Sequence, residues 1–166
     1  DRLHRRHDGG GDPVIGRRWA MATWLTLAVL AAVSCSSSVP APQSIALGRA
    51  TCAKCRSIIA GLEAAGQAVF PDGTVRHYDD LGCMATDPAA LKGDAQLYVQ
   101  LAGGRGWVRV EDIHFASPTH VRTAQGYNFL AYPEEEARQI DPAGWARGWN
   151  DLVAELARRN IPEVRR

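Results

Sequence analysis

The feature that most constrains the fold is an uncharged apolar stretch at residues 19–33. It follows a basic, glycine-rich segment and ends just before Ser34 and Cys35. A basic segment, a short apolar run and small residues before a cysteine are typical of a signal peptide. The stretch has 15 residues, whereas a helix needs roughly 20 to span a bilayer. We therefore expect residues 1–34 to be a signal peptide with an upstream extension, and the folded part to lie beyond them.

Cys35 is the expected lipid-acceptor residue. Ala32, Val33 and Ser34 precede it, and serines follow it, so the segment resembles a bacterial lipobox. Acyl chains on Cys35 would hold the protein on a membrane without a transmembrane helix. The expected location is the cell envelope, facing the periplasm or the cell exterior. A buried apolar helix with an incidental cysteine is the alternative.

The chain beyond residue 34 is nearly neutral. Its 132 residues carry 14 basic and 15 acidic side chains, so no basic patch remains for nucleic acid. This length is enough for one domain or for two small lobes that share a core. Residues 35–43 are rich in serine and proline and are expected to form a flexible tether. We expect the folded domain at residues 44–160 and a tail at 161–166.

The order of strand and helix signals predicts an α+β fold. Two strand pairs, each followed by a helix, indicate two small ββαβ-like lobes with antiparallel hairpins and a C-terminal helix. Turn residues separate the strands, and aspartates stand at expected helix starts. Strands are expected at 67–70, 74–78, 96–101, 107–110, 113–116 and 127–131, and helices at 79–91, from 133 and from 141.

Three cysteines in the folded part are candidate metal ligands. Cys52 and Cys55 are spaced so that both sulfurs can reach one ion, and Cys83 is followed by Met84. Thiolates and thioethers are soft ligands that select Cu(I), and also Zn(II). Basic residues next to the pair favour the thiolate form. The sequence therefore predicts a Cu(I) site with the ligands Cys52, Cys55, Cys83 and Met84, and with His120 as a possible accessory ligand.

Other roles for these cysteines stay open. In an oxidising compartment Cys52 and Cys55 can form a structural disulfide. A thioredoxin-like redox pair needs a helix after the motif, which the glycine-broken sequence at 56–61 disfavours. A structural zinc site needs a fourth ligand, for which His77 or His120 would serve. A lyase that cleaves a carbon–metal bond needs a carboxylate beside two cysteines, and Asp80 is the candidate.

Several segments together resemble the NosL family. They comprise Cys52-Ala-Lys-Cys55, Phe70-Pro-Asp-Gly73, the run from Thr74 to Met84, and the run from His114 to Ala137. The resemblance implies a lipoprotein with two ββαβ-type lobes, related in fold to organomercurial lyase. It also implies a Cu(I) chaperone for nitrous oxide reductase or its assembly factors.

The chain departs from the family pattern at two positions that bear on the site. The family's Cys-x-x-Cys-Gly-Met has Arg56-Ser57 in place of Gly-Met, and its Pro-Met-Gly-Tyr becomes Ala124-Gln125-Gly126-Tyr127. Two thioethers are therefore absent. The hypothesis carried forward is a non-enzymatic, Cu(I)-binding lipoprotein that delivers copper to nitrous oxide reductase or a related cuproprotein. A thiol–disulfide oxidoreductase and a metal-sequestering lipoprotein are the alternatives.

Overall fold

The computed structural model describes residues 40–142 and 147–159. The predicted signal peptide, the predicted lipid-acceptor Cys35 and the predicted tail lie outside the described residues. No helix within the described ranges has the length and apolar character needed to cross a membrane.

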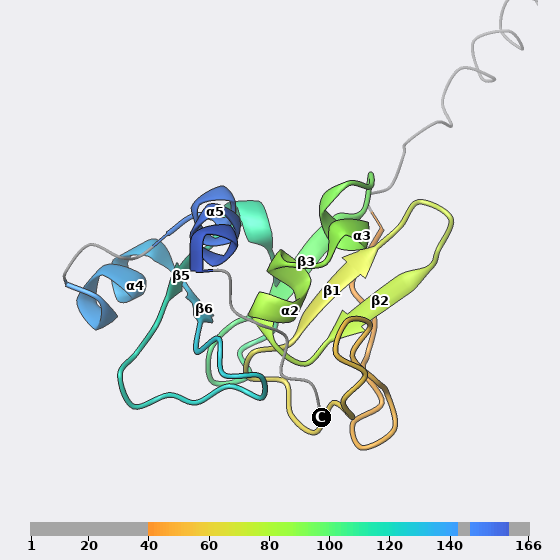
Figure 1. The fold of residues 1–166 in the computed structure, drawn as a ribbon, viewed down its shortest axis with the longest axis horizontal. Helices are drawn as coiled ribbons and strands as arrows, with labels where there is room; N and C mark the ends of the chain where they lie inside the picture. The colour runs from red at the N-terminus through yellow and green to blue at the C-terminus, as the bar shows by residue number, and fades with distance from the viewer. Residues whose placement is uncertain (1–39, 143–146, 160–166) are drawn as a thin grey trace, which may run out of the picture. The chain divides into compact units, whose positions relative to one another are not determined.

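A four-stranded antiparallel sheet forms the first half of the fold (Figure 1). Its first hairpin closes at Pro71-Asp72-Gly73, where the Asp72 carboxylate accepts a hydrogen bond from the Thr74 N–H at 2.8 Å. Gly73 has a φ of 85°, a conformation that glycine adopts at little cost. The strand order is β2-β1-β3-β4. The strands are β1 (Gly66–Val69), β2 (Val75–Tyr78), β3 (Gln96–Gln100) and β4 (Trp107–Arg109).

Two short helices connect β2 to β3. Asp80 caps the first, α2 (Leu81–Ala85), and Asp87 caps the second, α3 (Pro88–Leu91). Each carboxylate accepts a bond from a backbone N–H of the first helical turn, which satisfies a donor that has no partner inside the helix. The helix expected at 79–91 is therefore two short helices, which separate at Asp87-Pro88.

A smaller unit follows with the same order of elements. After the 3₁₀ turn η1 (Val110–Asp112), two antiparallel strands pair and a helix comes next. Beyond that helix, Arg147 forms an antiparallel bridge with Phe115 of the first strand, just as β3 pairs with β1. The α+β prediction is confirmed. The elements are β5 (His114–Ala116), β6 (Leu130–Tyr132) and α4 (Glu134–Ile140).

We call β1, β2, α2, α3, β3 and β4 lobe 1, and β5, β6, α4 and the Arg147 bridge lobe 2. A parallel bridge between Leu101 and Ala131 joins the two sheets. The C-terminal helix α5 (Trp149–Arg159) contacts both α2 and β5. Its buried Leu152 and Leu156 belong to the same apolar core as α2 and the first sheet.

Several boundaries differ from the sequence prediction. The strand expected at 127–131 is β6 at Leu130–Tyr132. The helix expected from Asp141-Pro142 begins instead at Trp149, because Asp141 closes α4 and the chain then pairs with β5. The described end of the predicted tether is bound to the sheet. Pro40 accepts a hydrogen bond from Tyr98, and the backbone of Gln43 bonds to the side chain of Gln67. Within the described residues, Pro40 and Gln43 thus already bond to the sheet, before the domain start expected at residue 44.

Candidate metal centre

The first two cysteines lie on a short closed loop before β1. Thr51 and Ile58 form an antiparallel bridge at its base, and the Cys52 N–H donates to the Ser57 carbonyl at 2.8 Å. Arg56 closes the turn with a φ of 68°. No helix follows Cys55 within residues 56–65, so the motif lacks the helical setting of a thioredoxin-like pair.

A backbone bond places this loop beside the end of β2. The Ala53 N–H donates to the His77 carbonyl at 2.7 Å. The chain then leaves β2 through Asp79 and enters α2, which carries Cys83. The cysteine loop and the junction between β2 and α2 are thereby brought together although some 30 residues separate Cys52 from Cys83.

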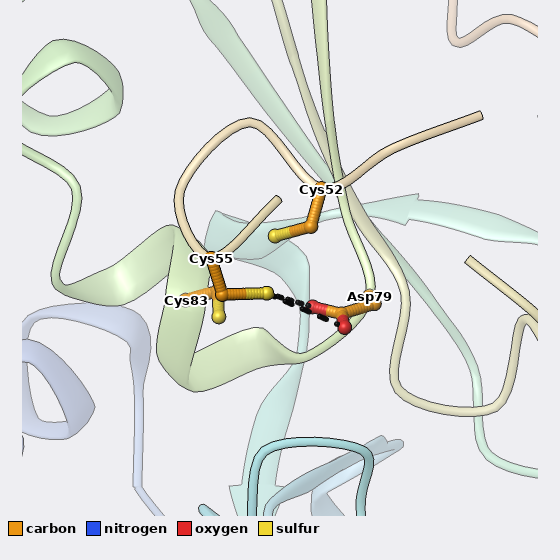
Figure 2. Close-up of side chains that lie close together, drawn as sticks. All are labelled: Cys52, Cys55, Asp79 and Cys83. Carbon is orange, nitrogen blue, oxygen red and sulfur yellow. Dashed lines mark hydrogen bonds between the residues drawn. The ribbon is translucent and has the colours of Figure 1, made fainter. Parts of the chain in front are cut away.

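Four donor groups converge at this place. The sulfurs of Cys52, Cys55 and Cys83 and a carboxylate oxygen of Asp79 all lie within 4.8 Å of one another. Figure 2 shows these side chains facing one small space. Cys52 is 0% exposed, Cys83 2% and Asp79 6%, whereas Cys55 is partly exposed. One ion held here would be largely shielded from water and reachable from the Cys55 side.

Asp79 is the member of this cluster that the sequence analysis did not identify as a ligand. The Cys55 thiol contacts both carboxylate oxygens at 3.5 Å (Figure 2). On the other side, the Gln125 amide donates to Asp79 Oδ2 at 3.0 Å and to the Ser57 hydroxyl at 3.2 Å. The adjacent Asp80, which caps α2, does not belong to the cluster.

The thiols do not share one protonation state. A hydrogen bond from the Cys83 thiol lowers the pKa of Cys52 to about 6. That same bond raises the pKa of Cys83 strongly, and burial adds to the rise. Burial also raises the pKa of Cys55. The contact with Cys83 thus favours the thiolate at Cys52 over one at Cys83 or Cys55, and the thiolate is the form that binds metals and attacks electrophiles.

A loop from lobe 2 covers the site. Asp80 is 0% exposed, and its carboxylate accepts bonds from the Thr123 hydroxyl, from the Gln125 N–H at 2.9 Å and from the Gly82 N–H at 3.0 Å. The Tyr127 ring lies so close to Gly82 that an added Cβ would be 1.9 Å from it. Asp80 thus fastens this loop to the N-terminus of α2, next to the donors.

A cavity of about 150 Å³ opens beside Asp79. Ile58 and Glu63 line it from the segment after the cysteine loop, and Arg122 and Leu130 line it from lobe 2. Ile58 is 60% exposed. The cavity therefore gives Asp79 an approach from outside that does not pass over the buried cysteines.

The other predicted ligands lie elsewhere. Met84 is fully buried, and its sulfur lies beside Gly66, where an added Cβ would be 2.9 Å from it. Its ligand role stays a prediction. His120 is exposed and does not join the gathered donors, and neither does His77. Burial lowers the pKa of His77.

Comparisons with models of known protein families and with curated proteins find no match to this chain. The chemistry of the site is therefore inferred from the geometry of its donor groups. Three sulfurs and one oxygen give the tetrahedral number of donors that Zn(II) prefers, while the sulfurs alone suit Cu(I). The described part of the chain thus contains a cysteine and aspartate cluster that can hold a metal ion.

Proposed function

We propose that this protein is a Cu(I)-binding lipoprotein of the cell envelope that passes copper to nitrous oxide reductase or a related cuproprotein. The observation that carries the proposal is the convergence of three cysteine sulfurs within 4.8 Å of one another. The resemblance to the NosL family supports the identity of the metal and of the recipient. Lipid on Cys35 would supply the anchor.

The difference in burial among the sulfurs suits binding followed by exchange. Cys52 and Cys83 are buried and would hold the ion, while the partly exposed Cys55 would be the first to let it go. A sulfur or imidazole of the partner can then enter before that thiolate leaves. The ion passes between ligand sets in this way without a catalytic base and without exposure to bulk water.

A Cu(I) competition titration of the full chain under reducing, oxygen-free conditions tests the metal assignment. Replacing both Cys52 and Cys55 with serine should abolish tight binding, because two of the three soft donors are lost. His120→Ala serves as the matched control and should bind like the wild type. Unchanged affinity in the double serine variant would contradict the proposal.

Delivery needs a separate experiment. The copper-loaded chain is mixed with the copper-free reductase, and metal is measured in the recipient after separation. Transfer faster than release to a competing chelator alone is the expected result. Binding without transfer would instead favour a metal-sequestering lipoprotein, the alternative that shares this site.

A second activity is favoured by one contact, that of Asp79 with the Cys55 thiol at 3.5 Å. In a carbon–metal lyase the Cys52 thiolate would bind the metal of an organometal cation. The Cys55 thiol would then give its proton to the carbon, so the carbon–metal bond breaks, a hydrocarbon leaves and the Cys55 sulfur becomes the second ligand. The carboxylate expected beside the cysteines was Asp80, but Asp79 is the one that contacts the Cys55 thiol, and in this step it would orient that thiol.

Hydrocarbon release from an organomercury cation, measured by gas chromatography, separates this activity from the copper role. Catalytic release by the wild type, lost in Cys55→Ser, would establish the lyase. No release beyond the uncatalysed rate would leave copper binding as the function of the cluster.

A further inference from the structure

The amide of Gln125 is the polar contact that ties Asp79 to the loop of lobe 2. Its Nε2 donates to Asp79 Oδ2 at 3.0 Å and to the Ser57 hydroxyl at 3.2 Å. Ser57 follows the cysteine loop directly, and its carbonyl accepts the bond that closes this loop at Cys52. One side chain therefore bridges the acid of the cluster and the segment that presents two of its sulfurs.

Several hydrogen bonds hold the backbone around Gln125. The Gln125 N–H donates to buried Asp80 at 2.9 Å. Thr123 and Asn128 exchange two bonds across the turn, at 2.9 and 3.1 Å, and Gly126 takes a φ of 77°. The amide of Gln125 thus approaches Asp79 from a set direction, as a group that orients a ligand must.

We propose that Gln125 is a positioning residue that makes Asp79 the oxygen donor of the centre and so sets its preference between divalent ions and Cu(I). The inference rests on the metal-binding function proposed above. Both oxygens of Asp79 contact the Cys55 thiol at 3.5 Å, but Oδ2 also accepts the bond from Gln125. Oδ1, which the amide does not hold, is therefore the oxygen through which Asp79 would bind an ion. That oxygen matters to Zn(II) and Co(II), which accept carboxylate ligands, and contributes little to Cu(I), which sulfur satisfies.

The test is a set of titrations of the full chain with Co(II), Zn(II) and Cu(I) under reducing conditions. Gln125→Leu keeps the approximate size of the side chain and removes its donor. Affinity for Co(II) and Zn(II) should fall about 10-fold, the usual effect of losing a group that orients a ligand. Affinity for Cu(I) should stay within about twofold because its sulfur donors are unchanged. The ligand-field absorption of bound Co(II) should shift, which a change in stability alone would not cause.

A double-mutant cycle shows whether Gln125 acts through Asp79. Asp79→Asn weakens the oxygen donor directly, and Gln125→Leu should add little to it, because both changes remove one coupled interaction. Gln139→Leu is the matched control, since the Gln139 side chain bonds to Glu135 on the exposed face of α4.

The outcomes separate the two proposals. Equal losses for Cu(I) and Co(II) in Gln125→Leu, or an additive effect in the Asp79→Asn background, would overturn the positioning role while the metal-binding function stands. If the wild type binds Cu(I) but Gln125→Leu changes the affinity for none of the ions, the positioning role is likewise overturned and the metal-binding function stands. A wild type that binds none of the three ions would overturn both.

Discussion

The two lobes share the order strand, strand, helix and then a segment that pairs with the first strand, but among the described residues the gathered donors lie on lobe 1 and on the cysteine loop before it. In lobe 1, Gln67 of β1 pairs with His77 of β2 and with Tyr98 of β3. In lobe 2, Phe115 of β5 pairs with Ala131 of β6 and with Arg147. The second strand ends at a tyrosine in both lobes and a helix follows soon after.

The difference lies at the junction between strand and helix. Lobe 1 continues as Asp79-Asp80-Leu81-Gly82-Cys83, with a carboxylate cap on α2. Lobe 2 continues as Pro133 and three glutamates, with no side-chain cap on α4. Instead of a site, lobe 2 contributes the loop that covers the donors of lobe 1. The same order of elements thus holds the donor cluster in lobe 1 and provides the covering loop in lobe 2.

The substitution expected to disturb the contact between the covering loop and α2 most is Gly82→Ala. The added methyl would lie 1.9 Å from the Tyr127 ring, so the covering loop must move away from α2. Overpacking of this kind should lower the free energy of unfolding by about 3 kcal/mol or more, measured by urea denaturation.

Gly61→Ala is the matched control, because nothing lies within 4 Å of the added Cβ and no positive φ is needed there. It should change the free energy of unfolding by less than about 0.5 kcal/mol. Equal stability of the two variants would show that the loop is not seated on α2.

The next largest effect is expected at the two helix starts. Asp80→Ala removes a buried carboxylate that accepts from Thr123, Gln125 and Gly82. The lost bonds leave buried donors without partners, so we expect a loss of about 2 to 3 kcal/mol in the free energy of unfolding.

Glu134→Ala makes the corresponding change at the start of α4. Its carboxylate is 53% exposed and pairs with Arg138, so the cost should be less than about 0.5 kcal/mol. Comparable losses in both variants would mean that α2 gains nothing from its link to lobe 2.

The strands and turns of lobe 1 were predictable because their signals are local. Pro71-Asp72-Gly73 can close a hairpin wherever it occurs, and Asp87-Pro88 starts a new helix by its own chemistry. The same logic failed at Asp141-Pro142. There the local cap signal is overruled by the bridge between Arg147 and Phe115, which delays the helix to Trp149.

The cysteines of the site were predictable from residue type, but the acid was not. Asp79 and Asp80 are adjacent, and either can cap α2 on local grounds. What separates them is distant in sequence, since Thr123 and Gln125 bind Asp80 and thereby turn Asp79 toward the sulfurs. The resemblance marked the position of Gln125 as one where the family has a methionine, but nothing indicated that its amide would hold Asp79, because its partners lie 46 and 68 residues away.

A subtler contrast concerns the two tyrosines that end β2 and β6. The Tyr78 hydroxyl donates to Asp87 at 2.8 Å and accepts from Arg76, which ties β2 to α3. Tyr78→Phe should lower the free energy of unfolding by about 1 to 2 kcal/mol, measured by thermal and urea denaturation.

Tyr132→Phe is the counterpart in lobe 2. Its hydroxyl makes no such bond to another residue in the part of the chain that the structure describes, so the change should be below about 0.5 kcal/mol. A larger loss of unfolding free energy in Tyr132→Phe than in Tyr78→Phe would contradict the inference that only the Tyr78 hydroxyl stabilises its lobe through hydrogen bonds.

The smallest expected effect compares the two non-glycine residues that have positive φ in the described ranges, one in the cysteine loop and one in the loop that covers the site. Arg56 has a φ of 68° and Asn128 one of 61°. A left-handed backbone costs an ordinary L-residue roughly 1 to 2 kcal/mol. Replacement by glycine removes this cost, but the greater freedom of glycine in the unfolded chain offsets part of the gain in stability. Arg56→Gly should therefore stabilise the protein by about 0.5 kcal/mol. Cu(I) affinity should be retained, since the sulfurs keep their places.

Asn128→Gly should have the opposite sign. Asparagine tolerates this conformation better than arginine does, and its side chain accepts a bond from the Thr123 N–H at 3.1 Å, which glycine cannot replace. We expect a loss of about 0.5 to 1 kcal/mol in the free energy of unfolding. Chemical denaturation of both variants and the wild type measures these changes. If Arg56→Gly destabilised the chain, the Arg56 side chain would be contributing contacts that outweigh its backbone strain, and the cysteine loop would depend on more than its closing hydrogen bonds.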